Sequence, residues 1–396
     1  MDILFLSHCV PNPPDKGEKI RAFHELIALS KKHRVHLACF ARSAEDIRHA
    51  HELKDHCASI YAEPFTPLRA LAGAALRFAC GGCLTTSYYG SRRMRRYIHS
   101  LKSLPLAATV SYSSAMVQYA PSHLPLWLDI VDVDSEKWFQ YGSTRWPGLL
   151  YKIEGRRLRA LESKYAARAE CTLASSPLEQ KLLLEIAPQA RIVSVTNGVD
   201  FEYFDPSLLR ERPGPSNRRY VAFVGSMDYY PNVDACCWFV DCIFGPLRRR
   251  FPDLEFLIVG RNPSRTVRKL GQVDGVVVTG GVPDVRPYLA FAHAVVAPLR
   301  IARGVQNKIL EALAMGKHVC ASAAVSNTFG GIPPTGLVVC NSTRNYIEEL
   351  TRFLQAPCSW NPALREAARR RFSWQNFQSI TDQLAASEGE TSVVHR

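Results

Sequence analysis

The sequence lacks an apolar run long enough to cross a bilayer as a helix, and it opens on a predicted strand instead of a secretory signal. We therefore expect a cytoplasmic protein. The sequence also lacks the G-x-G-x-x-G motif, which counts against a dinucleotide-binding dehydrogenase. Neither an internal sequence repeat nor a low-complexity tract is present. The chain should therefore fold as an ordinary globular protein.

Acidic residues are the minority charge: 36 Asp and Glu face 49 Lys and Arg, giving a net charge of +13. This excess favours an anionic partner, such as nucleotide phosphates, lipid phosphates, a membrane surface or nucleic acid. A nucleic-acid-binding protein would also need a recognised motif or an aromatic platform, and we find neither. The charge therefore points first to a phosphorylated ligand or a lipid surface.

Cysteine is not scarce, but its twelve copies do not form a metal signature. Most lie within predicted apolar strands or helices, where a free thiol packs as a small hydrophobe. The pair Cys80 and Cys83 has redox or zinc spacing, yet no second pair or histidine cluster accompanies it. We predict no metal site and no cofactor.

Short apolar strands alternate with helical stretches along the whole chain. These strands are rich in Val, Ile and Leu without polar alternation, as buried parallel strands are. In the first half they cover residues 3–7, 35–40, 59–62, 109–112, 126–131, 171–174 and 192–195. In the second half they cover residues 220–224, 255–259, 275–279, 294–297, 318–321 and 337–340. The pattern predicts an α/β protein with two doubly wound domains.

The predicted boundary is the segment rich in Pro, Gly and Ser before the second set of strands. We place an N-terminal domain at 1–205, a linker at 206–218 and a C-terminal domain at 219–372. A further helix is predicted at 373–387 and a disordered tail at 388–396. Ligands of open α/β sheets bind outside the carboxyl ends of the strands, so each domain should carry one ligand there.

The stretch 298–322, PLRIARGVQNKILEALAMGKHVCAS, is the most informative part of the sequence. It predicts a strand, a basic loop, a helix beginning near Gln306 and Asn307, and a stop at Gly316. Lys308 and Glu311 share one face of its first turn. A helix N-terminus with a lysine can bind phosphate, and a carboxylate one turn further on can accept hydrogen bonds from a ribose diol. The alternative is an ordinary amphipathic helix with a surface Lys–Glu pair.

The same stretch resembles the donor-site signature of GT-B glycosyltransferases of family 4, also called group 1. The segments Val195–Asp200 (VTNGVD) and Phe223–Asp228 (FVGSMD) resemble further motifs of that family, in the same order. The N-terminal DILFLSHCVPNPPDKGEKIRAFHEL and the later LDIVDVDSEKW resemble a subgroup associated with PEP-CTERM/exosortase exopolysaccharide systems. The resemblance implies two Rossmann-like domains facing a cleft and a C-terminal helix that crosses back onto the first domain. The first domain would bind the acceptor and the second the donor.

By this resemblance, the chain transfers a sugar from a UDP- or GDP-sugar to a glycan or a polyprenyl-diphosphate-linked acceptor, with retention and without a metal. Lys308 would balance the leaving diphosphate and Glu311 would hold the ribose. The predicted donor-binding residues are Gly225, Met227, Asn232, Arg261, Arg303, Lys308, Ile309 and Glu311. A nucleotide-sugar epimerase of the same fold and a basic nucleic-acid-binding protein remain as alternatives.

Two departures from the family pattern affect this interpretation. Many members carry an Arg and a Lys after the first strand of the second domain, whereas this chain has Ser226 and the Pro231–Asn232 pair there. Many also carry two glutamates separated by seven residues; Glu311 matches the second, whereas this chain has Arg303 in place of the first. The phosphate charge must therefore be balanced by Lys308, Arg303 or Arg261, and the donor sugar stays open.

In the first half, the loop after the first strand leads through Gly17 into a helix. The resemblance places Gly17, Lys19 and Arg21 at the acceptor side, and a proline-rich surface turn is the alternative. Asp132 and Asp134 follow another strand. Asp132 is predicted to be catalytic together with Lys308, as a base or as an acceptor-orienting group. The alternatives are helix capping and a D-x-D metal motif.

One apolar segment, residues 67–84, is rich in small residues and precedes the arginines at 92, 93, 95 and 96. Apolar surface beside cationic side chains suits a lipid-phosphate acceptor at a membrane surface. A buried helix followed by a solvated basic helix explains the same residues. Peripheral attachment to the inner face of the plasma membrane therefore stays an open alternative to a purely cytoplasmic protein.

Overall fold

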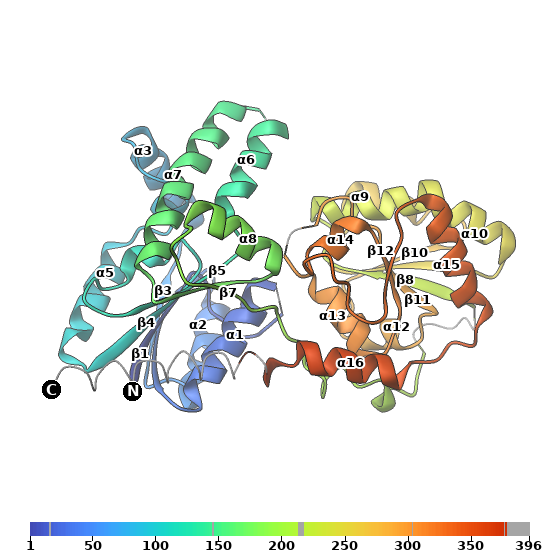
Figure 1. The fold of residues 1–396 in the computed structure, drawn as a ribbon, viewed down its shortest axis with the longest axis horizontal. Coiled ribbons are helices and arrows are strands. Elements are labelled where there is room, and N and C mark those ends of the chain that lie inside the picture. Colours follow the sequence, from blue (N-terminus) through green and yellow to red (C-terminus); the bar gives the residue numbers. More distant parts are fainter. Residues whose placement is uncertain (16, 145, 213–217, 303, 376, 378–396) are drawn as a thin grey trace. The chain divides into compact units, whose positions relative to one another are not determined.

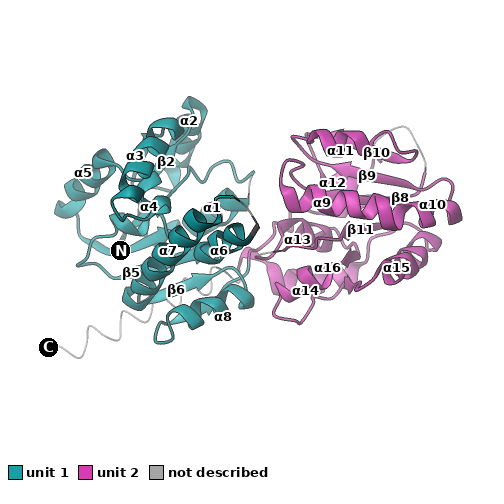
Figure 2. Ribbon diagram, turned by 90° about the horizontal axis from the view of Figure 1, so that it is seen from above, with its two compact units in different colours: residues 1–196, 377–396 teal, residues 197–376 magenta. Residues whose placement is uncertain are grey.

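The computed structural model describes residues 1–15, 17–144, 146–212, 218–302, 304–375 and 377. The chain divides into two compact units: Met1–Thr196 with the segment that begins at Phe377, and Asn197–Asn376 (Figure 2). Each unit is an α/β layer structure around one sheet, as Figure 1 shows.

Unit 1 contains a seven-stranded sheet in the order β3-β2-β1-β4-β5-β6-β7, and every strand pair is parallel. Its strands are β1 Asp2–Ser7, β2 Arg34–Ala41, β3 Ser59–Pro64, β4 Leu106–Tyr112, β5 Leu126–Val131, β6 Cys171–Ala174 and β7 Ile192–Ser194. Its helices are α1 Gly17–Ser30, α2 Ala44–His51, α3 Pro67–Ala79, α4 Leu84–Tyr88, α5 Arg92–Ser100, α6 Asp134–Thr144, α7 Gly148–Arg168 and α8 Pro177–Ile186.

Unit 2 contains a six-stranded parallel sheet in the order β10-β9-β8-β11-β12-β13. Its strands are β8 Tyr220–Val224, β9 Glu255–Val259, β10 Val276–Gly280, β11 Ala294–Ala297, β12 Val319–Ala321 and β13 Leu337–Val339. Its helices are α9 Tyr230–Phe239, the π-helix η5 Val240–Phe244, α10 Gly245–Arg250, α11 Arg265–Leu270, α12 Arg286–Ala290, α13 Asn307–Ala314, α14 Ala323–Asn327, α15 Thr343–Gln355 and α16 Pro362–Phe372. Short 3-10 turns occur at η1 Glu52–Asp55, η2 Leu101–Ser103, η3 Val117–Tyr119 and η4 Pro206–Leu208.

All thirteen predicted strands are present, and the predicted α/β class with two parallel sheets is confirmed. The central strands are buried along their length: β1, β6, β8 and β11 expose no residue. Helices cover both faces of each sheet, so the strands do not alternate polar and apolar residues along their length. This explains why continuous Val, Ile and Leu runs identified the strands.

The division between the units falls at Thr196 and Asn197, earlier than the linker placed at 206–218. The reason is packing: Val199 and Phe201 are 5% and 7% exposed and belong to the core of unit 2. The guanidinium of Arg365 on α16 also donates a 2.6 Å hydrogen bond to the carbonyl of Phe201. The chain is therefore attached to unit 2 before it reaches the Pro- and Gly-rich segment.

The predicted C-terminal helix 373–387 lies mostly outside the described residues, and the tail 388–396 lies entirely outside them. In each sheet the strand order reverses at one point: between β1 and β4 in unit 1, and between β8 and β11 in unit 2. At such a point neighbouring loops diverge and leave a crevice at the carboxyl ends of the strands.

Candidate functional site

Unit 2 brings three of the predicted donor residues, Gly225, Asn232 and Lys308, together at the point where its strand order reverses. The loop after β8 runs from Gly225 to Tyr229 and leads into α9, and the loop after β11 leads into α13, whose N-cap residue is Gln306. Asn307, the first residue of α13, accepts a 2.9 Å hydrogen bond from the side-chain amide of Asn197. The start of α13 is therefore fixed by a side chain from the beginning of unit 2.

Lys308 points from α13 towards the β8–α9 loop. Its Nζ donates a 2.6 Å hydrogen bond to Oδ1 of Asn232 and lies 4.3 Å from the ring centroid of Phe223. Asn232 is itself held, because its Nδ2 donates to the carbonyl of Ser226 at 2.8 Å. Burial lowers the pKa of Lys308 to about 8, and Cys236 and Glu311 only partly oppose that shift. Lys308 thus carries a positioned ammonium with no carboxylate bonded to it within the described chain.

Glu311 lies one turn further along α13. Burial raises the pKa of its carboxyl to about 7, and the nearby Lys308 ammonium only partly offsets the rise. No ion pair joins the two side chains, so the alternative of a surface Lys–Glu pair is not what the structure shows. Within the described residues, the Glu311 carboxylate has no hydrogen-bond partner from the protein. A half-buried acceptor without a donor is suited to a ligand that brings hydroxyl groups.

Two glycines allow the loops to meet at this place. A Cβ on Gly225 would lie 2.8 Å from Nζ of Lys308 and 2.7 Å from Nδ2 of Asn232. A Cβ on Gly260, after β9, would lie 1.6 Å from the carbonyl oxygen of Gly225. At Gly260 the close atom belongs to the backbone, so only glycine fits there, whereas at Gly225 a Cβ would displace the ends of the Lys308 and Asn232 side chains. The sequence predicts Gly225 as a site residue, but the requirement at Gly260 is visible only in the structure.

The other predicted donor residues differ in how accessible they are. Met227 and Ile309 are 0% exposed and pack in the core of unit 2, so only their backbone could face a ligand. Arg261 is exposed in the loop after β9, next to the glycine contact. Arg303 lies outside the described residues.

In unit 1, Arg21 corrects the prediction made from the sequence. Its side chain is 0% exposed, and its Nε donates a 2.6 Å hydrogen bond to Oδ2 of Asp129 while Nη1 donates to the carbonyl of Val195. A guanidinium so buried cannot reach an acceptor without breaking this pair. Lys19 is 9% exposed and bonded to Asp46 at 3.2 Å, whereas Gly17 begins α1 in an exposed position.

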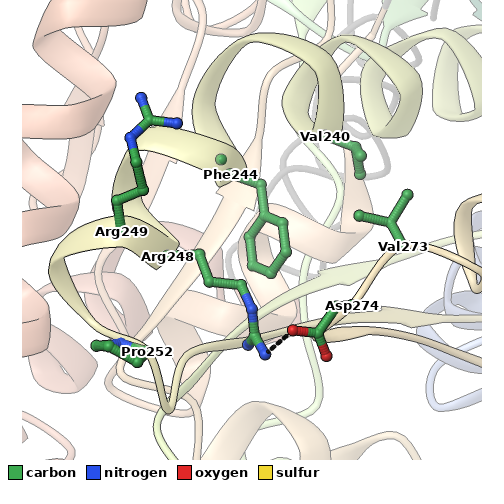
Figure 3. A pocket seen from close by; sticks show the side chains of 8 residues that line it. Val240, Phe244, Arg248, Arg249, Pro252, Val273 and Asp274 are labelled. Carbon is green, nitrogen blue, oxygen red and sulfur yellow. Dashed lines mark hydrogen bonds and ion pairs between the residues drawn. The ribbon is translucent and has the colours of Figure 1, made fainter.

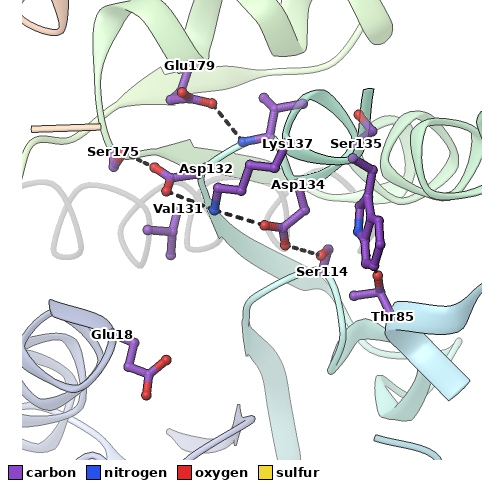
Figure 4. A network of polar contacts seen from close by, with 12 residues as sticks. Glu18, Thr85, Ser114, Val131, Asp132, Asp134, Ser135, Lys137, Ser175 and Glu179 are labelled. Carbon is purple, nitrogen blue, oxygen red and sulfur yellow. Dashed lines mark hydrogen bonds and ion pairs between the residues drawn. The ribbon is translucent and has the colours of Figure 1, made fainter. Parts of the chain in front are cut away.

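Asp132 follows β5 and belongs to a charge network (Figure 4). Its Oδ2 lies 3.1 Å from Nζ of Lys137, and its Oδ1 accepts a 2.9 Å hydrogen bond from Ser175. Lys137 also contacts Asp134 at 3.0 Å. Burial acts to raise the pKa of Asp132, but Lys137 and Ser175 outweigh it, so the pKa lies below its usual value. Asp132 is therefore an ionised carboxylate whose charge is balanced by Lys137, and it is a weak base.

The backbone before Asp132 is strained: Val131 has a positive φ of 66°, which a β-branched residue rarely adopts. Its N–H donates a 2.9 Å hydrogen bond to Oδ1 of Asp129, which compensates part of that cost. The D-x-D metal alternative fits this network poorly, because the Lys137 ammonium lies between the two carboxylates where a cation would bind. Sequence reasoning missed Lys137, although its spacing of three from Asp134 on a helix was a usable signal.

Two further side chains of unit 1 were not predicted. His8 follows β1, with its ring stacked on Tyr112 at 5.7 Å, and its Nε2 lies 3.7 Å from Oε2 of Glu18. Figure 4 shows Glu18 apart from the Lys137 network. The loops after β1 and β4 meet here, so His8 and Glu18 occupy the place where unit 1 would bind its ligand.

Among the described residues, no group of three or more His, Cys, Asp or Glu side chains is placed to hold a metal ion. Among the helices that the structure describes, none has the length and apolarity to cross a membrane. A pocket of about 430 Å³ lies beside η5 and α10, lined by Phe244, Arg248 and Asp274 among others (Figure 3). In this pocket Arg248 is bonded to Asp274 at 2.6 Å, and Asp274 lies just before β10. The pocket is therefore near the amino ends of the strands, whereas Lys308 lies near their carboxyl ends.

Comparisons with known proteins agree with this architecture. Sucrose-phosphate synthase from Thermosynechococcus elongatus is similar over 99% of this chain and 100% of that one, with a TM-score of 0.69 and 17% identity. HepE from Anabaena, solved with UDP and glucose, is similar over 98% of this chain and 100% of its own, with a TM-score of 0.65 and 15% identity. WaaG, a glycosyltransferase involved in lipopolysaccharide biosynthesis, is similar over 96% of this chain and 99% of its own, with a TM-score of 0.60 and 16% identity.

At these identities the structural similarity shows the fold, which is the predicted GT-B fold of two Rossmann-like α/β domains. A comparison with curated protein sequences gives no match. The family model described as Glycosyl transferases group 1 matches residues 218–356, which include Lys308 and Glu311. The chain therefore has the GT-B fold and carries a glycosyl transferases group 1 domain at residues 218–356.

Proposed function

We propose that this protein is a glycosyltransferase that moves a sugar from a nucleoside-diphosphate sugar to an acceptor hydroxyl. The observation that carries the proposal is the arrangement at the start of α13: a positioned Lys308 ammonium beside a half-buried, unpartnered Glu311 carboxyl. Phosphate and ribose are the two groups of a nucleotide sugar that such side chains recognise. The matched group 1 domain and the fold support the same conclusion.

The proposed chemistry is electrostatic. Breaking the bond between sugar and diphosphate places negative charge on the departing phosphate oxygens. Lys308 and the positive end of the α13 dipole would stabilise that charge as it develops. Because Asn232 already fixes the lysine, little reorganisation is needed when the donor binds. Arg261 and Arg303 are the further cations that we assign to the diphosphate, and no metal is part of the proposal.

The acceptor side favours retention at the anomeric carbon. An inverting enzyme needs a base that removes the acceptor proton. Asp132 is a poor base because Lys137 and Ser175 keep its pKa below the usual value. We therefore assign Asp132 to holding charge and geometry beside the acceptor. We further propose a glycan or polyprenyl-diphosphate-linked acceptor and a role in exopolysaccharide synthesis. WaaG, which shares the fold, is involved in lipopolysaccharide biosynthesis.

The test is a donor screen that measures release of UDP or GDP from nucleotide sugars, with and without a polyprenyl-diphosphate-linked glycan. Acceptor-dependent release supports the proposal. Conversion of the donor to its epimer without acceptor would instead indicate the epimerase alternative. Absence of donor binding, together with DNA binding that weakens steeply with salt, would indicate the nucleic-acid-binding alternative.

A matched set of variants connects the activity to the site. Lys308→Ala and the bulkier Lys308→Met should each weaken donor binding by roughly 1.5–3 kcal/mol, the contribution of a hydrogen bond to a charged group. Lys269→Ala removes an exposed lysine from α11 of the same unit and should leave binding unchanged. Equal donor affinity in the Lys308 and Lys269 variants would reject the role assigned to Lys308.

A further inference from the structure

Helix α3 is barely covered by the rest of the protein. Of its thirteen residues, only Ala74 is buried. Leu68, Leu71 and Leu76 are 80%, 53% and 70% exposed. They recur at helical spacing with exposed alanines at 72, 75 and 79, so the apolar side chains form one continuous stripe. A helix of this length is marginal in water without a packed face, so the stripe indicates an external partner.

A second apolar feature lies at the tip of the α6–α7 hairpin. Trp146 is 92% exposed, and Leu149 and Leu150 on the first turn of α7 are 68% and 49% exposed. Figure 1 shows α3 and this hairpin projecting beyond the sheet of unit 1 on the same side. They are also joined directly: the Arg157 guanidinium on α7 donates 2.8 Å hydrogen bonds to the carbonyls of Phe78 and Gly82. We call Leu68, Leu71, Leu76, Trp146, Leu149 and Leu150 the apolar crest.

The charges around the apolar crest have one sign. Across residues 67–79 and 146–157, the basic residues are Arg69, Arg77, Lys152, Arg156 and Arg157. The only acidic residue in these ranges is Glu154, which is 1% exposed and accepts hydrogen bonds from the N-terminus of α4 at 2.7 and 2.8 Å. The exposed part of these helices is therefore apolar and cationic.

We propose that the apolar crest docks this protein on the surface of an anionic lipid bilayer. Leucines would enter the boundary of the acyl chains, Trp146 would lie at the headgroup level, and the flanking cations would meet lipid phosphates. A second copy of the chain fits less well, because a symmetric contact would bring two cationic rims together in a protein of net charge +13. The inference deepens the proposed function, since a polyprenyl-linked acceptor would be held in the same bilayer.

The test is flotation of the full-length protein with vesicles. Vesicles of equal parts phosphatidylcholine and phosphatidylglycerol should bind it, more weakly at high salt, and pure phosphatidylcholine should bind it poorly. The double variant Leu71→Gln/Leu76→Gln should reduce the partition coefficient between water and vesicles at least about tenfold. The reason is that each substitution removes most of the free energy that a leucine side chain gains on entering the bilayer. Arg69→Glu should reduce it by about fivefold.

The matched control is Leu208→Gln, which changes a leucine that is 65% exposed in unit 2, outside the apolar crest. It should bind vesicles like the unaltered protein. Equal vesicle binding by all variants, or none by the unaltered protein, would overturn the inference. A dimer detected by light scattering that the Leu71→Gln/Leu76→Gln variant dissociates would overturn it in favour of a second copy. Calorimetry with UDP-glucose on the same proteins keeps the two proposals apart, because donor binding does not need the apolar crest.

Discussion

Replacing Glu311 by Gln should stabilise the protein above pH 7 and have no stabilising effect below pH 4.5. Burial raises the pKa of this carboxyl from 4.5 to about 7 in the folded protein. Between these values the folded state binds a proton that the unfolded state has released. The free energy of unfolding therefore falls as the pH rises through this window. Gln stays neutral throughout, so the variant should escape this loss.

The size of the effect follows from the shift. Full burial would make it about 3 kcal/mol, and solvent screening of a half-buried side chain leaves about 1–2 kcal/mol. Urea denaturation of both proteins across the pH range measures it directly. A stability difference that is the same on both sides of the window, or an unaltered protein that is the more stable one above pH 7, would refute the reasoning.

The same carboxyl should make donor binding pH-dependent. A ribose diol donates hydrogen bonds to the ionised form, so a bound donor selects that form. Affinity for UDP-glucose or GDP-mannose should weaken as the pH falls below 7, approaching about tenfold per unit, because the proton must first be lost. Glu311→Gln should bind more weakly by about 1 kcal/mol or more and without this pH dependence. If calorimetry finds the same pH profile for the unaltered protein and for Glu311→Gln, then Glu311 does not bind the ribose.

Three further predictions concern other residues. Gly225→Ala would place a Cβ 2.8 Å from Nζ of Lys308, so donor affinity measured by calorimetry should fall about tenfold with little change in the urea midpoint. Asp129→Asn removes the carboxylate that accepts the hydrogen bond of the buried Arg21 guanidinium and should lower the free energy of unfolding by about 3–5 kcal/mol; a loss below about 1 kcal/mol would contradict the structural role of the pair. Asp132→Asn should lower the transfer rate by less than about tenfold in steady-state assays, whereas loss of a true general base costs about 10²–10⁴-fold and would indicate inversion.

The fold could be predicted from the sequence because buried parallel strands have an apolar composition that is recognisable in short segments of the sequence. Unbroken Val, Ile and Leu runs located all thirteen strands, and Gly316, with a φ of 67°, ends α13 where its position predicts. Lys308 and Glu311 lie on one helix, α13, as their spacing predicts. Local pattern therefore predicts elements and which residues share one, and the donor-binding role of these two residues stays a prediction.

Residues whose role depends on distant partners could not be predicted in this way. Arg21 looks like an accessible cation in a helix after a loop, yet its partner Asp129 lies 108 positions away. Asn232 was predicted as a donor-binding residue, but its hydrogen bond to Lys308, 76 positions away, is not a property of its own neighbourhood. Burial of a charged group is decided by the packing of several elements, and no single segment contains that information.

The two lysines at the carboxyl edges of the sheets show how charge environment separates a structural role from a ligand-binding role. Lys137 contacts two carboxylates, and although its burial acts to lower its pKa, Asp134 and Asp132 together raise it. Its charge is already compensated, so a phosphate would have to compete with both aspartates. Lys308 is held by a neutral amide and an aromatic ring, and burial lowers its pKa. An anion bound beside Lys308 would stabilise its buried ammonium charge, whereas Lys137 already has two carboxylates that do so. For this reason we assign the donor phosphates to α13 and not to the network after β5.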